Sequence, residues 1–542
     1  NPGLGVMTVR MTALAGTGVL VRLALRRDRL LLPIWILVIA AIPVATASAI
    51  AELYPDVGSR LALGATIMAN PALQALTGPI FDPTSVGGLT AWRAITFATV
   101  LAALMSIMLV TRHTRAEEES GRAELIGAAP VGRYALPAAA VLVTGLANLL
   151  AALLLIAGFA GQGLPAAGSI AFAGAVAGVG LVFAGIAAVT AQLTENARTA
   201  NALAIAVLGL FLLLRAAGDA AGAEAVSWLS PLGWAQRTRA FADERWWLLA
   251  IVAAVAILLV AAADLLARRR DLGAGLLPSR RGPASAAASL RSPLALAWRL
   301  QRGLLLGWAA AFAVAGAVFG SLAAGVGDIV GDNPQIADML ARLGGAGALT
   351  DTFFATQLSL FALVAGGYAV QATLRLRAEE SIGRAEPVLV AAVPRWRWLA
   401  GHLACALAGS ALILAIAGLA AGLAHGLRIG EPATQAIRIL GAALAQIPAV
   451  WVLAAITVLL FGLLPRATSL AWAFLVVFAL LGQLGELLQI DERIRRLSPF
   501  AHSPSLPGGT IAVGPLIGLC LLSAALMAAG LAGFHRRDLN SD

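Results

Sequence analysis

Long apolar runs separated by short polar segments make up most of this 542-residue chain. Many runs reach about 20 residues, the length with which an α-helix crosses a bilayer. Alternating, half-polar strands are absent, so we expect an all-α polytopic membrane protein rather than a membrane barrel. The runs predict twelve transmembrane helices, at residues 30–51, 91–111, 135–160, 169–192, 200–216, 247–267, 304–324, 352–374, 398–424, 435–463, 469–488 and 512–534.

Arginine near the ends of the spans predicts their orientation, because positive residues there are retained in the cytoplasm. All 38 basic residues are arginine, and with a cytoplasmic N-terminus about two thirds of them fall on the inner side. We therefore expect both termini in the cytoplasm. The high alanine, glycine and arginine content is typical of a GC-rich bacterial genome, which favours a bacterial inner (plasma) membrane. The net charge of +10 follows from the arginines and does not indicate nucleic-acid binding.

The segment before the first span, residues 11–29, has leucine and valine at helical spacing beside arginine. This pattern predicts an amphipathic helix that lies on the inner membrane surface. The alternative is an early start of the first span. We expect residues 1–29 to form a cytoplasmic N-terminal segment that contains this helix.

Several motifs occur twice, in the same order. The matching pairs are RLLLPIW at 29–35 with RGLLLGW at 302–308, LSPLGW at 229–234 with LSPFAH at 497–502, Arg198 with Arg466, and RRDL at 269–272 with RRDL at 536–539. The chain is thus predicted to be a tandem repeat of six spans. Because six is even, the two halves would be parallel, related by an axis along the membrane normal.

The predicted organisation follows from this repeat. A first six-helix half covers residues 30–267 and a second covers 304–534. Between them, residues 268–303 form a cytoplasmic linker, rich in Pro, Gly, Ala and Ser, and a second interfacial segment. Residues 535–542 form a cytoplasmic tail.

Two charged loops carry the strongest repeat, RAEEESGRAELIGAAPVGR at 115–133 and RAEESIGRAEPVLVAAVPRWR at 377–397. Glu118 and Arg122, like Glu380 and Arg384, are spaced i, i+4, which favours an ion pair along one short helix. Such a pair contributes only a few tenths of a kcal/mol, so stability does not explain why both copies retain it. A surface on which another protein docks would explain why both copies retain it. The alternative is a cytoplasmic loop whose charges were copied by the duplication.

The paired acids, the glycine, the following acid and the downstream proline resemble the loop between helices 2 and 3 in ABC-type export permeases with six helices per half, the type V exporters. The segments 229–247 and 497–509 are similar to those of the subgroup called exporters of polyketide antibiotics. The resemblance implies that each loop is a coupling helix that docks on an ATP-binding subunit. The residues it implicates are Glu117, Glu118, Gly121, Arg122, Glu124, Glu379, Glu380, Gly383, Arg384 and Glu386.

The chain encodes no energy source of its own. A phosphate-binding P-loop needs a lysine, and this chain has none. Two copies of an ATP-binding cassette subunit are therefore the expected partners, with ATP and magnesium bound there and no cofactor in this chain. The two cysteines lie in apolar runs and the five histidines are scattered, so neither a metal site nor catalytic residues are predicted.

The substrate path is an expectation from the resemblance, because similar exporters line it with the second and fifth helices of each half. The larger or polar residues on those spans are Thr96, Thr99, Met105, Asn201, Phe211, Phe354, Gln357, Phe361, Trp472 and Phe478. An apolar cavity of this kind suits hydrophobic or amphipathic compounds such as antibiotics and drugs, although lipid export would need much the same cavity. The resemblance also implies short re-entrant helices within 217–246 and 489–511.

Two other classes remain as alternatives. A major-facilitator secondary transporter also has twelve spans in parallel halves, but it usually carries ionisable groups within them. Here the spans contain few carboxylates, with Asp264 and Glu486 close to predicted ends. A membrane-bound enzyme would need clustered His, Asp or Glu, which the sequence does not show.

Overall fold

The computed structural model describes residues 13–68, 77–220, 222–271, 273–277, 285, 287–328, 345–391, 393–484 and 491–538. Every regular element in this part of the chain is a helix, which confirms the all-α class. The chain divides into two compact units, Asn1–Gly282 and Pro283–Asp542. The division falls within the segment predicted to link two halves.

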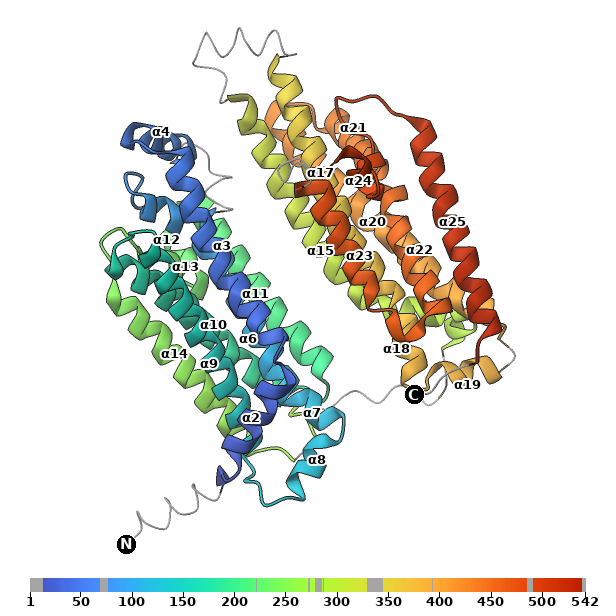
Figure 1. The fold of residues 1–542 in the computed structure, drawn as a ribbon, viewed down its shortest axis with the longest axis horizontal. Helices are drawn as coiled ribbons and strands as arrows, with labels where there is room; N and C mark the ends of the chain where they lie inside the picture. The colour runs from blue at the N-terminus through green and yellow to red at the C-terminus, as the bar shows by residue number, and fades with distance from the viewer. Residues whose placement is uncertain are drawn as a thin grey trace. The chain divides into compact units, whose positions relative to one another are not determined.

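The first unit is a bundle of long helices with short helices at both of its ends (Figure 1). Its elements are α2 (Thr17–Arg27), α3 (Leu31–Leu53), α4 (Val57–Met68), α6 (Val86–His113), α7 (Arg115–Glu119), α8 (Arg122–Gly127), α9 (Ala135–Gly161), α10 (Ala166–Leu193), α11 (Ala197–Ala220), α12 (Glu224–Ser227), α13 (Pro231–Arg237) and α14 (Trp246–Ala267).

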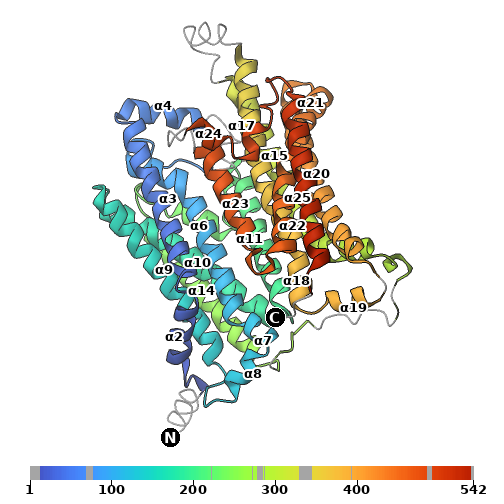
Figure 2. The same cartoon turned by 45° about the vertical axis from the view of Figure 1, so that its right-hand side comes forward.

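Helix α10 forms the centre of this bundle and packs against α6, α9, α11 and α14. A buried polar contact helps to fix these neighbours, since Asn148 donates to Ser106 Oγ at 2.9 Å across α9 and α6. Interhelical hydrogen bonds of this kind hold helices together in membranes. Both views place α2, α7 and α8 at one end of the unit and α4 at the other (Figures 1 and 2).

The second unit has a similar order of long and short helices. Its elements are η1 (Ala288–Leu290), α15 (Pro293–Asp328), α17 (Gly345–Thr373), α18 (Arg375–Ser381), α19 (Ala385–Val390), α20 (Arg395–Ile429), α21 (Pro432–Leu444), α22 (Ile447–Leu463), η2 (Pro465–Ala467), α23 (Leu470–Ala479), η3 (Leu480–Leu484), α24 (Glu492–Arg495), η4 (Pro499–His502) and α25 (Val513–Arg536).

Small residues allow close helix contacts in the second unit. A Cβ added at Gly320 of α15 would lie 2.1 Å from the carbonyl oxygen of Ala421 in α20. A Cβ added at Gly462 of α22 would lie 1.9 Å from the carbonyl oxygen of Gly530 in α25. Both helix pairs therefore approach backbone to backbone, as small-residue interfaces do in membranes.

The described residues contain eleven helices long and apolar enough to span a membrane, which is compatible with the twelve predicted spans. The difference concerns residues 469–488. There α23 continues into a π-helical turn, η3, and Glu486 lies outside the described residues. Within the described residues, the apolar helix at this place is shorter than a full span.

Part of the predicted linker is attached to the first unit. The backbone N–H groups of Leu276 and Leu277 donate to the carbonyl oxygens of Gln192 and Leu193 at the end of α10, at 3.1 and 2.9 Å. The predicted linker is therefore bound to the first unit as far as Leu277.

Alanine substitutions can test the close contact of α22 with α25. We expect Gly462→Ala and Gly530→Ala to destabilise the protein by about 1–3 kcal/mol, because the added methyl group forces two backbones apart. The measurement is the melting temperature of the purified chain in detergent. The control is Gly518→Ala on α25, where nothing lies within 4 Å of an added Cβ. There the better helix propensity of alanine should leave stability equal or slightly higher, and equal effects at all three positions would contradict the close contact.

Candidate functional site

The two charged loops fold into pairs of short helices, α7 with α8 and α18 with α19, at one end of their respective units (Figure 2). A glycine with positive φ separates the helices of each pair. Gly121 has φ 72° and Gly383 has φ 73°, a conformation that glycine adopts without steric cost. The prediction of one continuous short helix is therefore wrong in both copies, because a break at the repeated glycine turns the chain.

Glu118 is held inside the first unit by a two-point contact with Arg270. Nη1 and Nη2 of Arg270 donate to Oε2 and Oε1 of Glu118 at 2.8 and 2.6 Å, the fork geometry in which a guanidinium binds a carboxylate most strongly. Arg115 also donates to this carboxylate at 2.5 Å, and the N–H of Gly273 donates at 3.2 Å. Glu118 thus connects α7 to the residues that follow α14.

The second unit repeats this fork with the equivalent residues. Nη1 and Nη2 of Arg537 donate to Oε1 and Oε2 of Glu380 at 2.6 and 2.9 Å. The guanidinium of Arg537 also lies over the rings of Phe461 and Phe534, 4.9 and 5.1 Å from their centroids. Arg270 and Arg537 occupy the same position of the repeated RRDL motif. In each half, therefore, the second glutamate of the charged loop binds the end of the last long helix.

The first glutamate of each loop has different partners in the two halves. Glu117 pairs with Arg27 of α2 and lies 3.6 Å from Arg122. Glu379 pairs instead with Arg375, at 2.6 Å and four residues earlier. The predicted i, i+4 pair of Glu118 with Arg122 is not formed, because Arg270 takes the carboxylate of Glu118 and Arg122 turns to Glu117.

Four of the ten implicated residues remain exposed, and all four lie at or beyond the glycine break. They are Arg122, Glu124, Arg384 and Glu386. Leu125 of α8 and Val390 of α19 lie on the same short helices and are 76% and 80% exposed. Each loop therefore has a buried half, which fixes it to its own unit, and an exposed half with charged and apolar side chains that a partner protein could contact.

The sequence is similar to that of a known family of permeases. The family model described as multidrug efflux system permease Rv1217c, C-terminal domain, matches residues 19–268 and 290–535, one stretch in each unit. The multidrug efflux system permease protein Rv1217c of Mycobacterium tuberculosis (strain ATCC 25618 / H37Rv) is 45% identical over 532 residues, which cover 98% of this chain and 96% of the relative. The chain belongs to the Rv1217c family of multidrug efflux permeases.

The Rv1217c-family permease also has a buried ionic cluster at the opposite end of the first unit, which sequence reasoning missed. Asp219 lies 3.6 Å from Arg215 and 3.5 Å from Arg237, and it accepts a hydrogen bond from Ser227 at 2.7 Å. The cluster joins α11 to α12 and α13. Arg215 lies at the end of the span predicted at 200–216, and Asp219 and Arg237 follow it, so these charges resembled those of a loop boundary, and only the LSPLGWAQR motif marked the segment.

Two short helices, α12 and α13, occupy the first segment that the resemblance assigned to re-entrant helices. Ser230 caps α13 by accepting from the N–H of Leu232, and Pro231 follows at the first helical position, a standard way to start a helix. Gln236 of α13 donates to Thr96 Oγ1 at 2.8 Å and to the carbonyl of Thr77 at 3.0 Å. This segment is therefore anchored to the N-terminal half of α6.

The residues predicted to line the substrate path differ in exposure. Thr99, Met105, Phe354, Phe361 and Phe478 are buried within their own units, Thr96, Asn201, Phe211 and Gln357 are partly buried, and Trp472 is exposed. Several serve in packing, since Phe211 contacts Phe183 and Phe361 contacts Phe312. Their role in substrate binding stays a prediction.

Removal of Arg270 or Arg537, the arginine of either fork, should destabilise this permease. We expect Arg270→Gln or Arg537→Gln to cost about 3–5 kcal/mol, because each leaves a buried carboxylate without its main partner. Arg269→Gln and Arg536→Gln remove the neighbouring exposed charge and serve as matched controls. The measurement is the melting temperature in detergent. If each control lowers it as much as its partner variant, the forks do not hold the loops, whereas recovery in the Glu380→Arg, Arg537→Glu double variant would support them.

Proposed function

We propose that this chain is the transmembrane subunit of an ATP-driven exporter that moves hydrophobic or amphipathic compounds, including antibiotics and drugs, out of the cell. Two ATP-binding cassette subunits, one docked on each charged loop, would bind ATP and magnesium and supply the energy. The name of the mycobacterial relative supports drugs as the class of cargo. The absence of lysine supports a separate ATPase, because the chain cannot form a P-loop.

The observation that carries this proposal is the division of each loop into a fixed half and an exposed half. The exposed helices α8 and α19 directly follow α7 and α18. The Glu118–Arg270 fork attaches α7 to the end of α14, and the Glu380–Arg537 fork attaches α18 to the end of α25. A movement of α8 would therefore be transmitted to the long helices of the first unit, and a movement of α19 to those of the second unit. A loop that was charged only for solubility would need neither the fork nor exposed leucine and valine.

Coupling then depends on side chains beyond the glycine break. We expect Leu125→Asp and Val390→Asp to weaken co-purification of the ATP-binding subunit roughly tenfold or more, since an anchor at the centre of an interface is worth more than about 1 kcal/mol. Both side chains are exposed, so the melting temperature of the permease should not change. Glu124→Arg and Glu386→Arg should likewise lower drug-stimulated ATP hydrolysis. The partner for these assays would be a soluble protein with a P-loop, sought among the products of the genes next to that of the permease.

The matched control is Glu52→Arg, an exposed glutamate at the end of α3, the end of the first unit opposite α8 (Figure 1). It should leave both binding and stimulated hydrolysis unchanged. Normal ATPase coupling in all four loop variants would remove the docking role. Drug transport by the permease in vesicles under an ion gradient alone, indifferent to ATP, would replace the proposal with a secondary transporter.

A further inference from the structure

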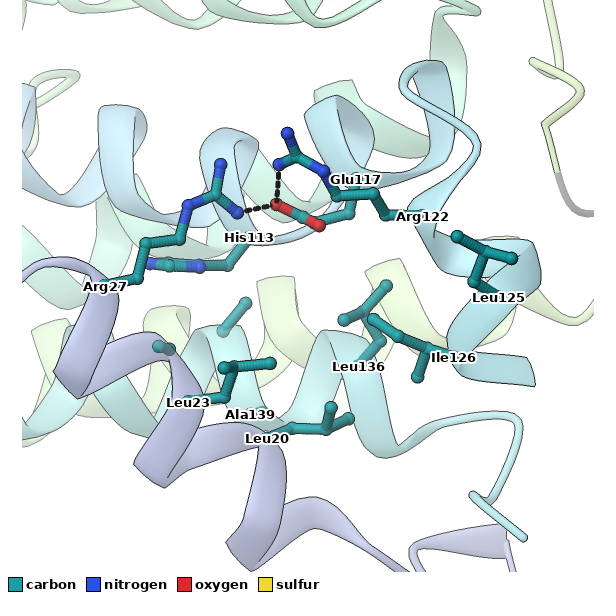
Figure 3. A pocket seen from close by; sticks show the side chains of 12 residues that line it. Leu20, Leu23, Arg27, His113, Glu117, Arg122, Leu125, Ile126, Leu136 and Ala139 are labelled. Atoms are coloured by element: carbon teal, nitrogen blue, oxygen red, sulfur yellow. Dashed lines mark hydrogen bonds and ion pairs between the residues drawn. The ribbon is translucent and has the colours of Figure 1, made fainter. Parts of the chain in front are cut away.

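A cavity of about 520 Å³ lies in the first unit where α2, α8 and α9 meet the end of α6. Its floor is apolar and includes Leu20, Leu23, Leu136 and Ala139, while Arg27 and Arg122 lie along one side of it (Figure 3). The volume is within the range of sites that hold small molecules, about 300–1,000 Å³. The cavity is thus large enough for part of an amphipathic ligand.

The charged side of the cavity has an excess of positive charge. Glu117 lies between Arg27 and Arg122 and pairs with both (Figure 3), so one carboxylate faces two guanidinium groups. The side chains of Arg27 and Arg122 are 35% and 55% exposed, which leaves donors available. Guanidinium groups bind phosphate oxygens by the same paired contacts that bind carboxylates.

The other titratable groups at this side do not cancel the excess. His113 bonds to Asp28 at 2.6 Å, and Arg112 lies 3.0 Å from the same carboxylate. The carboxylate of Asp28 is therefore already bound by two partners on α6. Arg22 and Arg26 of α2 are exposed and add further positive charge nearby.

The apolar side of the cavity belongs in part to α2, the helix that the sequence predicts to lie at a membrane surface. Helix α2 precedes the first long apolar helix, and its Val19 and Leu23 are exposed while Leu20 and Ala24 are buried. A basic helix with an exposed apolar stripe lies in the interface between headgroups and acyl chains. A ligand that reaches this cavity therefore comes from the same interface, where molecules with an anionic head and an apolar tail are abundant.

The second half offers an internal comparison, because it has lost the features of this site. In the alignment of 29–35 with 302–308, Leu300 stands where the first half has Arg27, and the constant offset of the loops places Arg375 where it has His113. Glu379 is bound by Arg375, and α15 runs unbroken through the positions where α2 ends and α3 begins. The basic cavity is thus a property of the first half rather than a consequence of the shared fold.

We propose that this cavity binds an anionic phospholipid from the membrane leaflet in which α2 lies. The phosphate would lie between Arg27 and Arg122, and an acyl chain would follow Leu20, Leu23 and Leu136. Because Arg122 belongs to α8, a bound lipid would hold α8 against α2 and α9. That consequence for coupling rests on the docking role proposed for α8, whereas the lipid site does not.

Photoactivatable phosphatidylglycerol with a diazirine in its acyl chain tests the site on the full-length chain in nanodiscs. We expect peptides that contain residues 17–27 and 135–140 to be labelled several-fold more than with the matching phosphatidylcholine. Arg27→Leu, which introduces the residue of the second half, should remove most of this preference. Arg26→Leu is the matched control, since it removes the same charge from a neighbouring exposed position outside the cavity, and it should retain the preference.

A second variant separates binding from folding. Ala139→Leu fills the apolar floor and keeps every charge, so it should reduce labelling with phosphatidylglycerol, and its melting temperature is measured alongside because Ala139 is buried. Equal labelling by the two lipids, or unchanged labelling in both Arg27→Leu and Ala139→Leu, would overturn the proposal. Displacement of the lipid by inorganic phosphate alone would also contradict it, since it would show a site for the anion without the chain. Displacement by a transported drug but not by excess phosphatidylglycerol would assign the cavity to substrate entry.

Discussion

The organisation of both charged loops depends on one interaction, the fork between a buried glutamate and the arginine that follows the last long helix. A carboxylate removed from water needs a partner of opposite charge, and the bidentate geometry of Arg270 on Glu118 and of Arg537 on Glu380 satisfies both oxygens at once. The fork fixes α7 and α18, whereas the charged residues beyond each glycine, such as Arg122 and Arg384, remain exposed. The fork therefore divides each loop into a part that is bound to its own unit and a part that is exposed.

The long helices could be predicted from sequence and the loop contacts could not. Hydropathy alone placed spans such as α9 and α14 to within a few residues, because a bilayer imposes both length and composition on a helix. The predicted i, i+4 pair of Glu118 with Arg122 does not form, because such a helical pair contributes only tenths of a kcal/mol and Arg270 donates two hydrogen bonds to Glu118. The RRDL repeat was visible in the sequence, but nothing local indicates which carboxylate it binds.

The buried ionic cluster around Asp219 could not be predicted from the sequence either, because it too depends on contacts between distant segments. Arg215 and Asp219 lie at the end of a predicted span, where charged residues ordinarily mark the boundary with water, yet both are buried. Their burial depends on Arg237 and Ser227, which arrive with α12 and α13. Hydropathy cannot distinguish a charge at a boundary from one covered by a later segment, because that difference is entirely tertiary.

The two halves retain the same fork but differ in what lies beside it, and this difference argues for unequal roles. Position Glu117 is shared between α2 and α8, whereas Glu379 is satisfied within four residues by Arg375. The first loop is therefore bound to a separate helix, α2, whereas this glutamate of the second loop is bound within its own helix. If two identical ATP-binding subunits dock on the two loops as proposed, they would meet loops that are held differently, because Glu117 joins the first loop to α2 and Glu379 is bound within its own helix.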